Sequence, residues 1–334
     1  MPAVLLDAER VLHDLDEIWR AIGKGEGSGV LRACAMTIIV VSPEDDDPQA
    51  VAEALAHLTR EHPSRVVLIG LRKGLAAPTS RANVQCWMPF GRRQQICAER
   101  IEIDAPIGRM NDVMPVIRGV LVADLPVVLW CRSLAIANSA ECAALLPLAG
   151  KIIIDTSSAK EARDVLPGVA ALHSGRAAVA DLAWTRITRW RETVYNIFRG
   201  PERKHHLSAL TDIQLQWAGE GMPTTVAYLG GWLKALAPKA RLSLTCIDRK
   251  MPERGMGRIR DLAFSCGATT LRLHRPEGIG VAIEIDHLES RMLFPRLDIE
   301  ALLREELSVF GRDARFERAL ENAPAIANLP VQMP

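Results

Sequence analysis

The 334-residue chain lacks the signatures of the common catalytic and cofactor-binding motifs. It contains no G-x-S-x-G nucleophile elbow, no H-E-x-x-H zinc motif and no Walker A sequence, and no dinucleotide-binding fingerprint follows a predicted strand. The eight histidines are scattered, whereas zinc sites need closely grouped ligands. We therefore predict no catalytic residue, no metal and no cofactor.

Two further absences concern location and partners. No apolar run reaches the roughly 18 residues of a membrane-spanning helix, and the first residues lack the basic and uninterrupted apolar regions of a signal peptide. The formal net charge is only +1, so no overall field attracts nucleic acid or an anionic membrane. These features predict a cytoplasmic protein that binds neither nucleic acid nor a membrane.

The cysteines form no recognisable pairing pattern. Their number, seven, is odd, and no C-x-x-C sequence occurs. Most of them lie in apolar, strand-like runs, which predicts buried free thiols in a reducing compartment. The sequence selects no disulfide pair from Cys34, Cys86, Cys97, Cys131, Cys142, Cys246 and Cys266.

Aromatic residues are also scarce, at 4% of the chain, yet Trp184 and Trp190 lie within one short segment. Apolar residues recur there at steps of three and four, so the pattern predicts one helix over 181–198. Asp181 is a suitable N-cap, because its carboxylate can accept the free amides of the first turn. Tyr195 widens the apolar stripe. Buried aromatic residues dominate core packing, which favours core positions for both tryptophans.

Arg191 interrupts the apolar face of this predicted helix. At about 100° per residue it falls beside Trp184, Ile187 and Tyr195. A guanidinium in such a place must pair with a carboxylate or phosphate, stack on a tryptophan, or reach water. An internal salt bridge or snorkelling is one interpretation, and an anion or partner site is the other.

The periodicity elsewhere predicts an α/β protein with two α/β domains. Uniformly apolar strands in the first half indicate a largely parallel or mixed sheet covered by helices. In the second half, apolar and small or polar residues alternate over 279–286, which indicates a mixed or antiparallel sheet with flanking helices.

We expect the following organisation along the chain. An N-terminal helix and a glycine-rich linker at 23–29 are followed by two domains, and turn formers over 166–178 mark the boundary. Single helices are expected near 139–148 and 298–322, and the last residues should be loose. The predicted limits are 1–30 for helix and linker, 31–168 for the first domain, 169–325 for the second and 326–334 for the tail.

The segment Asp155–Ser158 follows a buried strand. Ligands bind in open α/β sheets at the carboxyl ends of the strands, so Asp155, Ser157 and Ser158, with Arg65, could line a sugar-phosphate site. The alternative is local: Ser158 and Glu161 match the S-x-x-E capping box of a following helix.

Five segments, taken in order, resemble the glucose-6-phosphate dehydrogenase assembly protein family, OpcA. They are HPSR at 62–65, DLPVVLW at 124–130, DTSS at 155–158, DLAWTRITRWR at 181–191 and GWL at 231–233. The chain departs from the family pattern at Arg189, where a proline is expected, and at Cys131, where a second tryptophan often follows Trp130.

The resemblance implies a non-catalytic, cytoplasmic partner that promotes the assembly or activity of glucose-6-phosphate dehydrogenase in the oxidative pentose phosphate pathway. A sugar-phosphate-binding enzyme or metabolite sensor using the first α/β domain is the alternative. The family offers no catalytic residues to carry over. The candidate partner-binding or structural residues are His62, Ser64, Arg65, Asp124, Trp130, Asp155, Ser157, Ser158, Asp181, Trp184, Arg186, Trp190, Arg191 and Trp232.

Overall fold

The computed structural model describes residues 6–24, 30–88, 95–200, 203–248, 258–267, 269–276, 278–286 and 288–333. The chain forms two compact units, each built from separate stretches of sequence. Unit 1 comprises Met1–Asp155, Leu172–Ala180 and Ile299–Gly311, and unit 2 comprises Thr156–Ala171, Asp181–Asp298 and Arg312–Pro334. The domain limits expected from the sequence stay a prediction.

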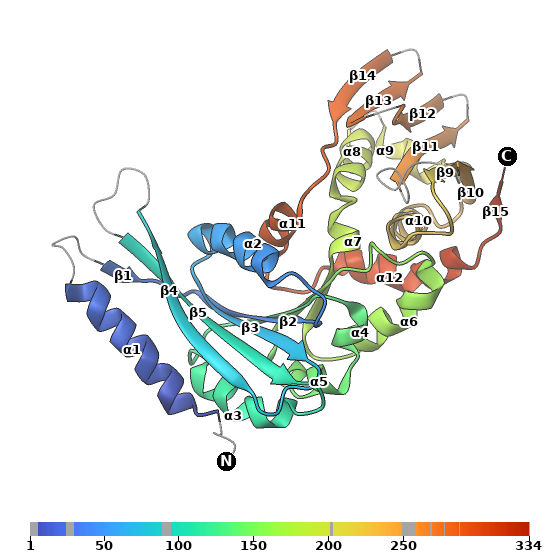
Figure 1. The fold of residues 1–334 in the computed structure, drawn as a ribbon. Coiled ribbons are helices and arrows are strands. Elements are labelled where there is room, and N and C mark those ends of the chain that lie inside the picture. Colours follow the sequence, from blue (N-terminus) through green and yellow to red (C-terminus); the bar gives the residue numbers. More distant parts are fainter. Residues whose placement is uncertain are drawn as a thin grey trace. The chain divides into compact units, whose positions relative to one another are not determined.

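The core of unit 1 is an eight-stranded, largely parallel sheet in the order β1-β5-β3-β2-β6-β7-β8, with β4 antiparallel to β5 (Figure 1). Strands β6 and β7 are buried along their whole length, as in sheets covered on both faces. The strands are β1 (Val30–Arg32), β2 (Met36–Ser42), β3 (Ser64–Arg72), β4 (Thr79–Trp87), β5 (Gln95–Pro106), β6 (Val127–Cys131), β7 (Lys151–Ile154) and β8 (Ala178–Asp181).

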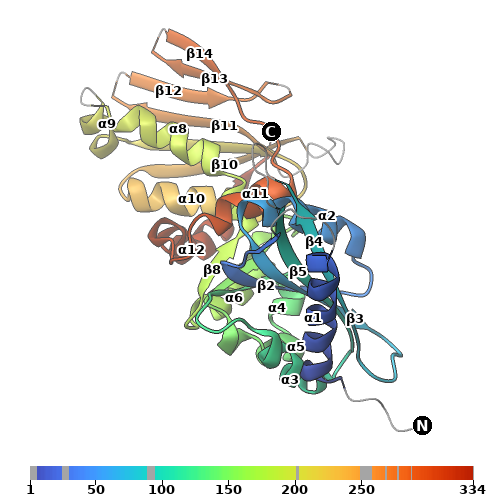
Figure 2. The same cartoon turned by 90° about the vertical axis from the view of Figure 1, so that its left-hand side faces the viewer.

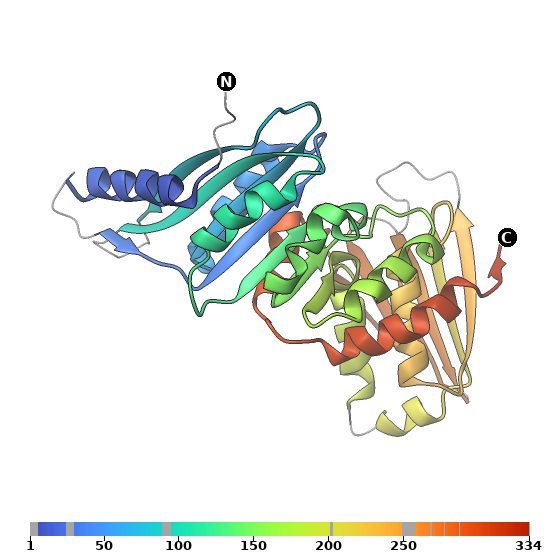
Figure 3. The same cartoon turned by 90° about the horizontal axis from the view of Figure 1, so that it is seen from below.

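Helices cover both faces of this sheet. In Figures 1 and 3, α2 and α11 lie on one face and α1 and α3 on the other. The helices are α1 (Ala8–Lys24), α2 (Pro48–Glu61), α3 (Met110–Val120), α4 (Leu134–Ala137), α5 (Ala140–Ala143), the 3-10 turn η1 (Leu146–Leu148) and α11 (Ile299–Leu307). The predicted first sheet, largely parallel and helix-covered, is confirmed.

Unit 2 contains a seven-stranded mixed sheet in the order β14-β13-β12-β11-β9-β10-β15. Strands β9, β10 and β15 are parallel, and the remaining neighbours are antiparallel, as predicted for the second domain. The strands are β9 (Asp212–Ala218), β10 (Arg241–Asp248), β11 (Arg258–Cys266), β12 (Thr269–His274), β13 (Gly280–Ile285), β14 (Leu288–Leu293) and β15 (Val331–Gln332).

Two helices of unit 2 pack on the same face of its sheet (Figure 2). The register places Phe264 of β11, Ile213 of β9 and Leu242 of β10 in one row. The ring of Phe198 in α8 packs against Phe264, and Gly230 of α10 lies against Leu242. Helix α12 packs on α10. The helices are α6 (Ala162–His173), α7 (Leu182–Thr185), α8 (Thr188–Phe198), α9 (Lys204–Ser208), α10 (Thr224–Leu236) and α12 (Ala314–Ala327).

The prediction of a single helix over 181–198 is wrong. Helix α7 ends at Thr185 and α8 begins at Thr188, with Arg186 and Ile187 between them. Asp181 nevertheless caps α7 as predicted, accepting a hydrogen bond from the Ala183 amide at 2.9 Å. The apolar spacing continues across the break, so periodicity alone could not reveal it.

Other predicted helix limits also need correction. The helix expected at 139–148 is the short helix α5 followed by η1, and the helix expected at 298–322 is α11 and α12, which belong to different units. The supposed turn region 166–178 is largely α6, although Pro167 lies inside that helix. In each case tertiary packing, rather than local composition, set the limits of the helix.

Two further predictions concern the glycine-rich linker and the C-terminal tail. Of the glycine-rich linker, residues 25–29 lie outside the described residues. The tail is not loose throughout, because β15 pairs in parallel with Leu244 and Thr245 of β10. Within the described ranges, no helix is long and apolar enough to cross a membrane.

The prediction of buried free thiols is wrong for one pair of cysteines. Cys86 of β4 and Cys97 of β5 are directly opposite in the antiparallel register and form a disulfide. The register of two strands decides this pairing, and no spacing motif encodes it. The free thiols are Cys34, Cys131, Cys142, Cys246 and Cys266.

Candidate functional site

Asp181, at the end of β8, is the centre of a buried hydrogen-bond cluster in unit 2. Besides capping α7, its carboxylate accepts hydrogen bonds from the Thr156 amide at 3.1 Å and the Thr156 hydroxyl at 2.5 Å. The Tyr228 hydroxyl of α10 donates to it at 2.8 Å. One carboxylate therefore joins the segment after β7, the start of α7 and helix α10.

The chemistry of this cluster is that of a structural core. Burial, followed by the negative charge of Asp181, raises the pKa of Tyr228 well above its usual value, so the phenol remains a proton donor. Thr224 donates to the Thr156 carbonyl at 3.2 Å. All four residues of the cluster, Asp181, Tyr228, Thr156 and Thr224, are buried and therefore shielded from solvent. Their polar groups satisfy one another by hydrogen bonding.

Trp184 and Trp190 occupy the core positions predicted for them, each being 3% exposed. The indole nitrogen of Trp184 donates to Asp313 at 2.9 Å, and its ring packs against Tyr228 and Phe316. Trp190 meets Phe294 edge to face at 5.3 Å. These contacts place both tryptophans inside unit 2 rather than on its surface.

Arg191 stacks on a tryptophan, one of the options expected for it. Its guanidinium carbon lies 3.6 Å from the ring centroid of Trp184, and Nη2 donates to the Thr188 hydroxyl at 2.7 Å. Tyr195 does not widen the apolar stripe, because its side chain is 48% exposed. Arg189 is exposed and pairs with Glu192 at 3.5 Å.

These contrasting environments give a prediction. We expect Arg191→Ala to lower the free energy of unfolding by about 1–2 kcal/mol, because a partly desolvated cation–π contact and a hydrogen bond are lost. Arg189→Ala should change it by less than about 0.5 kcal/mol, because exposed ion pairs contribute little. Urea denaturation of both variants measures the difference, and equal losses would contradict the assigned stacking.

In unit 1, Arg65 is committed to an internal ion pair. Its Nε and Nη2 each lie 2.6 Å from Oε2 of Glu99, and Nη1 donates to the Val120 carbonyl. Glu99 also accepts from Trp19 at 2.7 Å and pairs with Arg32 at 2.6 Å. This cluster connects α1, β1, β3 and β5 with the end of α3, so Arg65 is a structural residue here rather than a free phosphate ligand.

The other candidates of unit 1 lie at turns or in the core. His62 follows α2, and the buried Ser64 donates to its carbonyl at 2.6 Å. Asp124 is exposed in a turn with a φ of 63°. Trp130 is buried in β6, and Asp155, which follows β7, is half-buried.

The capping box predicted at Ser158 and Glu161 is absent from the described structure. Helix α6 begins at Ala162, so the exposed Ser158 lies in the preceding turn. The Ala162 amide instead donates to the Met222 carbonyl at 2.7 Å, and Glu161 accepts from the Met222 amide at 3.4 Å. Contacts with a distant segment therefore set the start of this helix.

The structure brings three candidate residues, Ser157, Arg186 and Trp190, to one pocket of unit 2. Its volume is about 240 Å³. Sequence reasoning missed the rest of its wall, which comes from α8, α10, β11 and the segments after β12 and β14. We call this site the arginine pocket, because five arginines line it: Arg186, Arg189, Arg258, Arg275 and Arg296.

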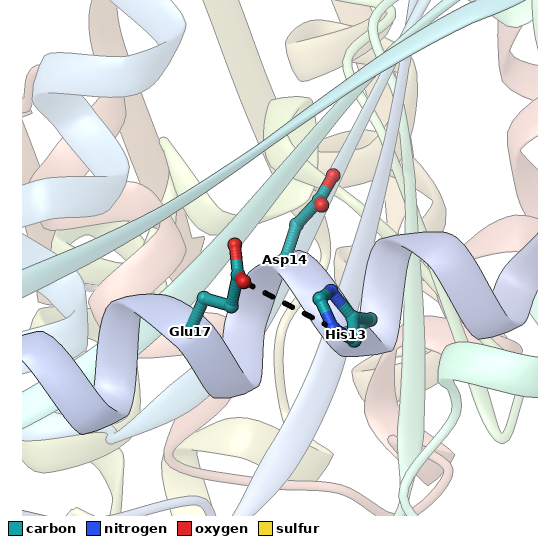
Figure 4. A group of neighbouring side chains, drawn as sticks. All are labelled: His13, Asp14 and Glu17. Carbon is teal, nitrogen blue, oxygen red and sulfur yellow. Dashed lines mark ion pairs between the residues drawn. The ribbon is translucent and has the colours of Figure 1, made fainter.

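The remaining candidate residue, Trp232, is buried in α10. A separate group of potential metal ligands lies on α1 (Figure 4), where atoms of His13, Asp14 and Glu17 are within 4.8 Å of one another. All three side chains are exposed, as expected for the polar face of a surface helix.

Comparisons with known proteins match both halves of the chain to one family. Residues 52–171 match the glucose-6-phosphate dehydrogenase subunit N-terminal domain, and residues 177–320 match the C-terminal domain of the same subunit. A curated relative from Synechocystis, named putative OxPP cycle protein OpcA, is 26% identical over 153 residues. That match spans 45% of this chain but only 32% of the relative.

Solved structures resemble the chain more distantly. KijD10, a 3-ketoreductase from Actinomadura kijaniata, is 10% identical with a TM-score of 0.46, covering 89% of this chain and 98% of the ketoreductase. A dehydrogenase from Chromobacterium violaceum is 9% identical with a TM-score of 0.47, covering 88% and 94% of the two chains.

Proposed function

The chain belongs to the glucose-6-phosphate dehydrogenase subunit family, OpcA, and we propose that it is a non-catalytic partner that promotes the assembly or activity of this dehydrogenase through protein contact. The observation that carries the proposal is the pair of family matches, both described as parts of a subunit of that enzyme. The name of the Synechocystis relative supports a place in the oxidative pentose phosphate pathway. The proposed location is the cytoplasm.

The environments of the buried candidate residues support a structural role rather than a catalytic one. The polar groups around Asp181 and Arg65 are buried and satisfy one another. A partner of this kind acts by binding the active or assembled state of the enzyme more tightly than the other states. A tenfold shift of that equilibrium needs about 1.4 kcal/mol of differential binding.

Strand β14 is the surface that we propose for this contact. It lies at one edge of the sheet of unit 2, with β13 as its neighbour, and all six of its residues are exposed. Leu288 and Leu293 are 73% and 69% exposed. An edge strand that exposes apolar side chains favours association, because its backbone can pair with another chain.

The test mixes the purified chain with the dehydrogenase of its own organism. We expect co-elution on size exclusion and a change in the enzyme's rate or substrate affinity. Leu288→Glu should weaken the association at least about tenfold, because burying an unpaired charge at an apolar contact costs at least about 1.4 kcal/mol. Ile107→Glu, at an exposed apolar position of unit 1, is the matched control.

The outcomes separate the two parts of the proposal. Absence of co-elution together with unchanged kinetics would refute the proposed function. Association that Leu288→Glu leaves intact would refute β14 as the contact surface and leave the family role standing.

A further inference from the structure

The arginine pocket concentrates positive charge, and the described residues of its wall include no acidic side chain. Among the described residues that line it, five are arginines and none is aspartate or glutamate. Of these five, Arg189 pairs with Glu192 at 3.5 Å, whereas Arg258, Arg275 and Arg296 form no ion pair within the described residues. Three of the five guanidinium groups therefore face the pocket without a carboxylate partner in the described part of the chain.

Arg275 is the most buried of these residues, with 6% of its surface exposed. Its guanidinium lies 5.2 Å from the ring of Trp190 and 5.8 Å from that of Phe294. Nε is shielded from solvent and has no hydrogen-bond partner among the residues described. Burial, followed by the charges of Arg258 and Arg260, lowers the pKa of Arg275 to about 10.

Arg258 and Arg296 add to this excess of charge. In the described part of the chain neither forms an ion pair. Burial, then the charges of Arg260 and Arg296, lowers the pKa of Arg258. Like charges gathered at a partly buried site are costly, and a bound anion would relieve both the repulsion and the desolvation.

The geometry points to a phosphate-binding site: we propose that the arginine pocket holds the phosphate group of a small phosphate monoester. Guanidinium groups match phosphate oxygens in fork geometry, and several of them suit a dianion better than a single carboxylate. The volume of about 240 Å³ lies below the range of pockets for drug-sized ligands. The ligand is therefore a small molecule.

Other groups on the wall suit the remainder of such a ligand. Ser157 and Thr225 bring hydroxyls to the pocket, and the Thr225 oxygen has no hydrogen-bond partner among the described residues. Trp190 and Phe294 supply apolar surface. Pockets that combine apolar walls with a few convergent polar groups are typical of small-molecule sites.

The experiment uses the full chain alone, so its outcome is independent of the proposed dehydrogenase contact. Titration calorimetry at constant ionic strength measures the affinity of the chain for inorganic phosphate and for glycerol 3-phosphate. Glycerol is the neutral control. We expect glycerol 3-phosphate to bind and to raise the melting temperature, because a ligand of the folded state stabilises it.

Two variants locate the site. Arg258→Gln and Arg296→Gln should each weaken binding about tenfold, because each removes a charged hydrogen-bond donor. Arg241→Gln, which removes an exposed arginine outside the pocket, should leave affinity unchanged. Arg296 is itself exposed, so its replacement should not prevent folding.

Each outcome is decisive. Binding of glycerol 3-phosphate that both pocket variants weaken supports the proposal, and tighter binding than that of inorganic phosphate supports recognition of the ester. Equal binding of inorganic phosphate would refute the ester and identify free phosphate as the ligand. If neither anion binds, or if the pocket variants do not change the binding, the proposed phosphate site is overturned. A pocket that accepts only an acidic protein segment would fall under the first of these outcomes.

Discussion

Replacing Asp181 with alanine should lower the free energy of unfolding by about 3–5 kcal/mol, because buried donors would lose their acceptor. At least four hydrogen bonds converge on this carboxylate, from the Thr156 amide and hydroxyl, the Ala183 amide and the Tyr228 hydroxyl. Each donor left unsatisfied costs about 1–3 kcal/mol, and the costs are not additive. Urea denaturation followed by circular dichroism measures the loss.

A second N-cap provides the control for this result. Asp47 caps α2 through one bond to the Gln49 amide at 2.9 Å and is exposed. Asp47→Ala should therefore cost only about 1 kcal/mol, the usual value of a lost cap. If both substitutions destabilise the chain equally, Asp181 acts as a cap alone and the buried cluster contributes nothing.

Tyr228→Phe combined with Asp181→Ala should lower the free energy of unfolding by less than the sum of the two single losses, because both substitutions remove the same hydrogen bond.

Gly231→Ala should destabilise unit 2 by about 2–3 kcal/mol, because the new methyl group would overpack the contact between α10 and α12. Its Cβ would lie 2.3 Å from the Ala319 carbonyl oxygen and 3.0 Å from the Ala323 amide. Both are backbone atoms of α12, so the two helices would have to move apart. Helix propensity alone predicts the opposite sign, since alanine is favoured over glycine by about 1 kcal/mol.

Two other glycines separate the clash from propensity. At Gly23 of α1, no atom lies within 4 Å of the place that an added methyl group would take, so Gly23→Ala should be neutral or slightly stabilising. At Gly230 the nearest atom, 2.8 Å away, belongs to the side chain of Ile326, which can move. Gly230→Ala should therefore cost less than Gly231→Ala. A stabilised Gly231→Ala variant in urea would show that α10 and α12 do not pack this closely.

Local signals in the sequence predicted a large part of the fold correctly. Asp181 caps α7 as its position indicated, because a cap involves residues only two or three positions apart. The apolar runs identified the parallel strands of unit 1, and the alternation over 279–286 identified β13, in which Val281 and Ile283 are buried.

The incorrect predictions concern contacts between distant segments. The disulfide between Cys86 and Cys97 follows from strand register, and the start of α6 follows from Met222. Arg191 had several acceptable partners in the sequence, and the fold selected Trp184. Apolar spacing continued through Arg186 and Ile187, so the break between α7 and α8 was not visible in the sequence.

By itself the sequence determined the parallel strands of unit 1, the alternating strand β13, the helix cap at Asp181 and the burial of both tryptophans of the 181–198 segment. Periodicity and capping act within a few residues, and a single stretch of chain is enough to encode them. Only the tertiary structure decided which polar and charged groups lie together. Asp181 gathers donors from three segments, and the arginine pocket gathers side chains from Ser157 to Leu297, because such sites depend on strand order and helix packing rather than on any local motif.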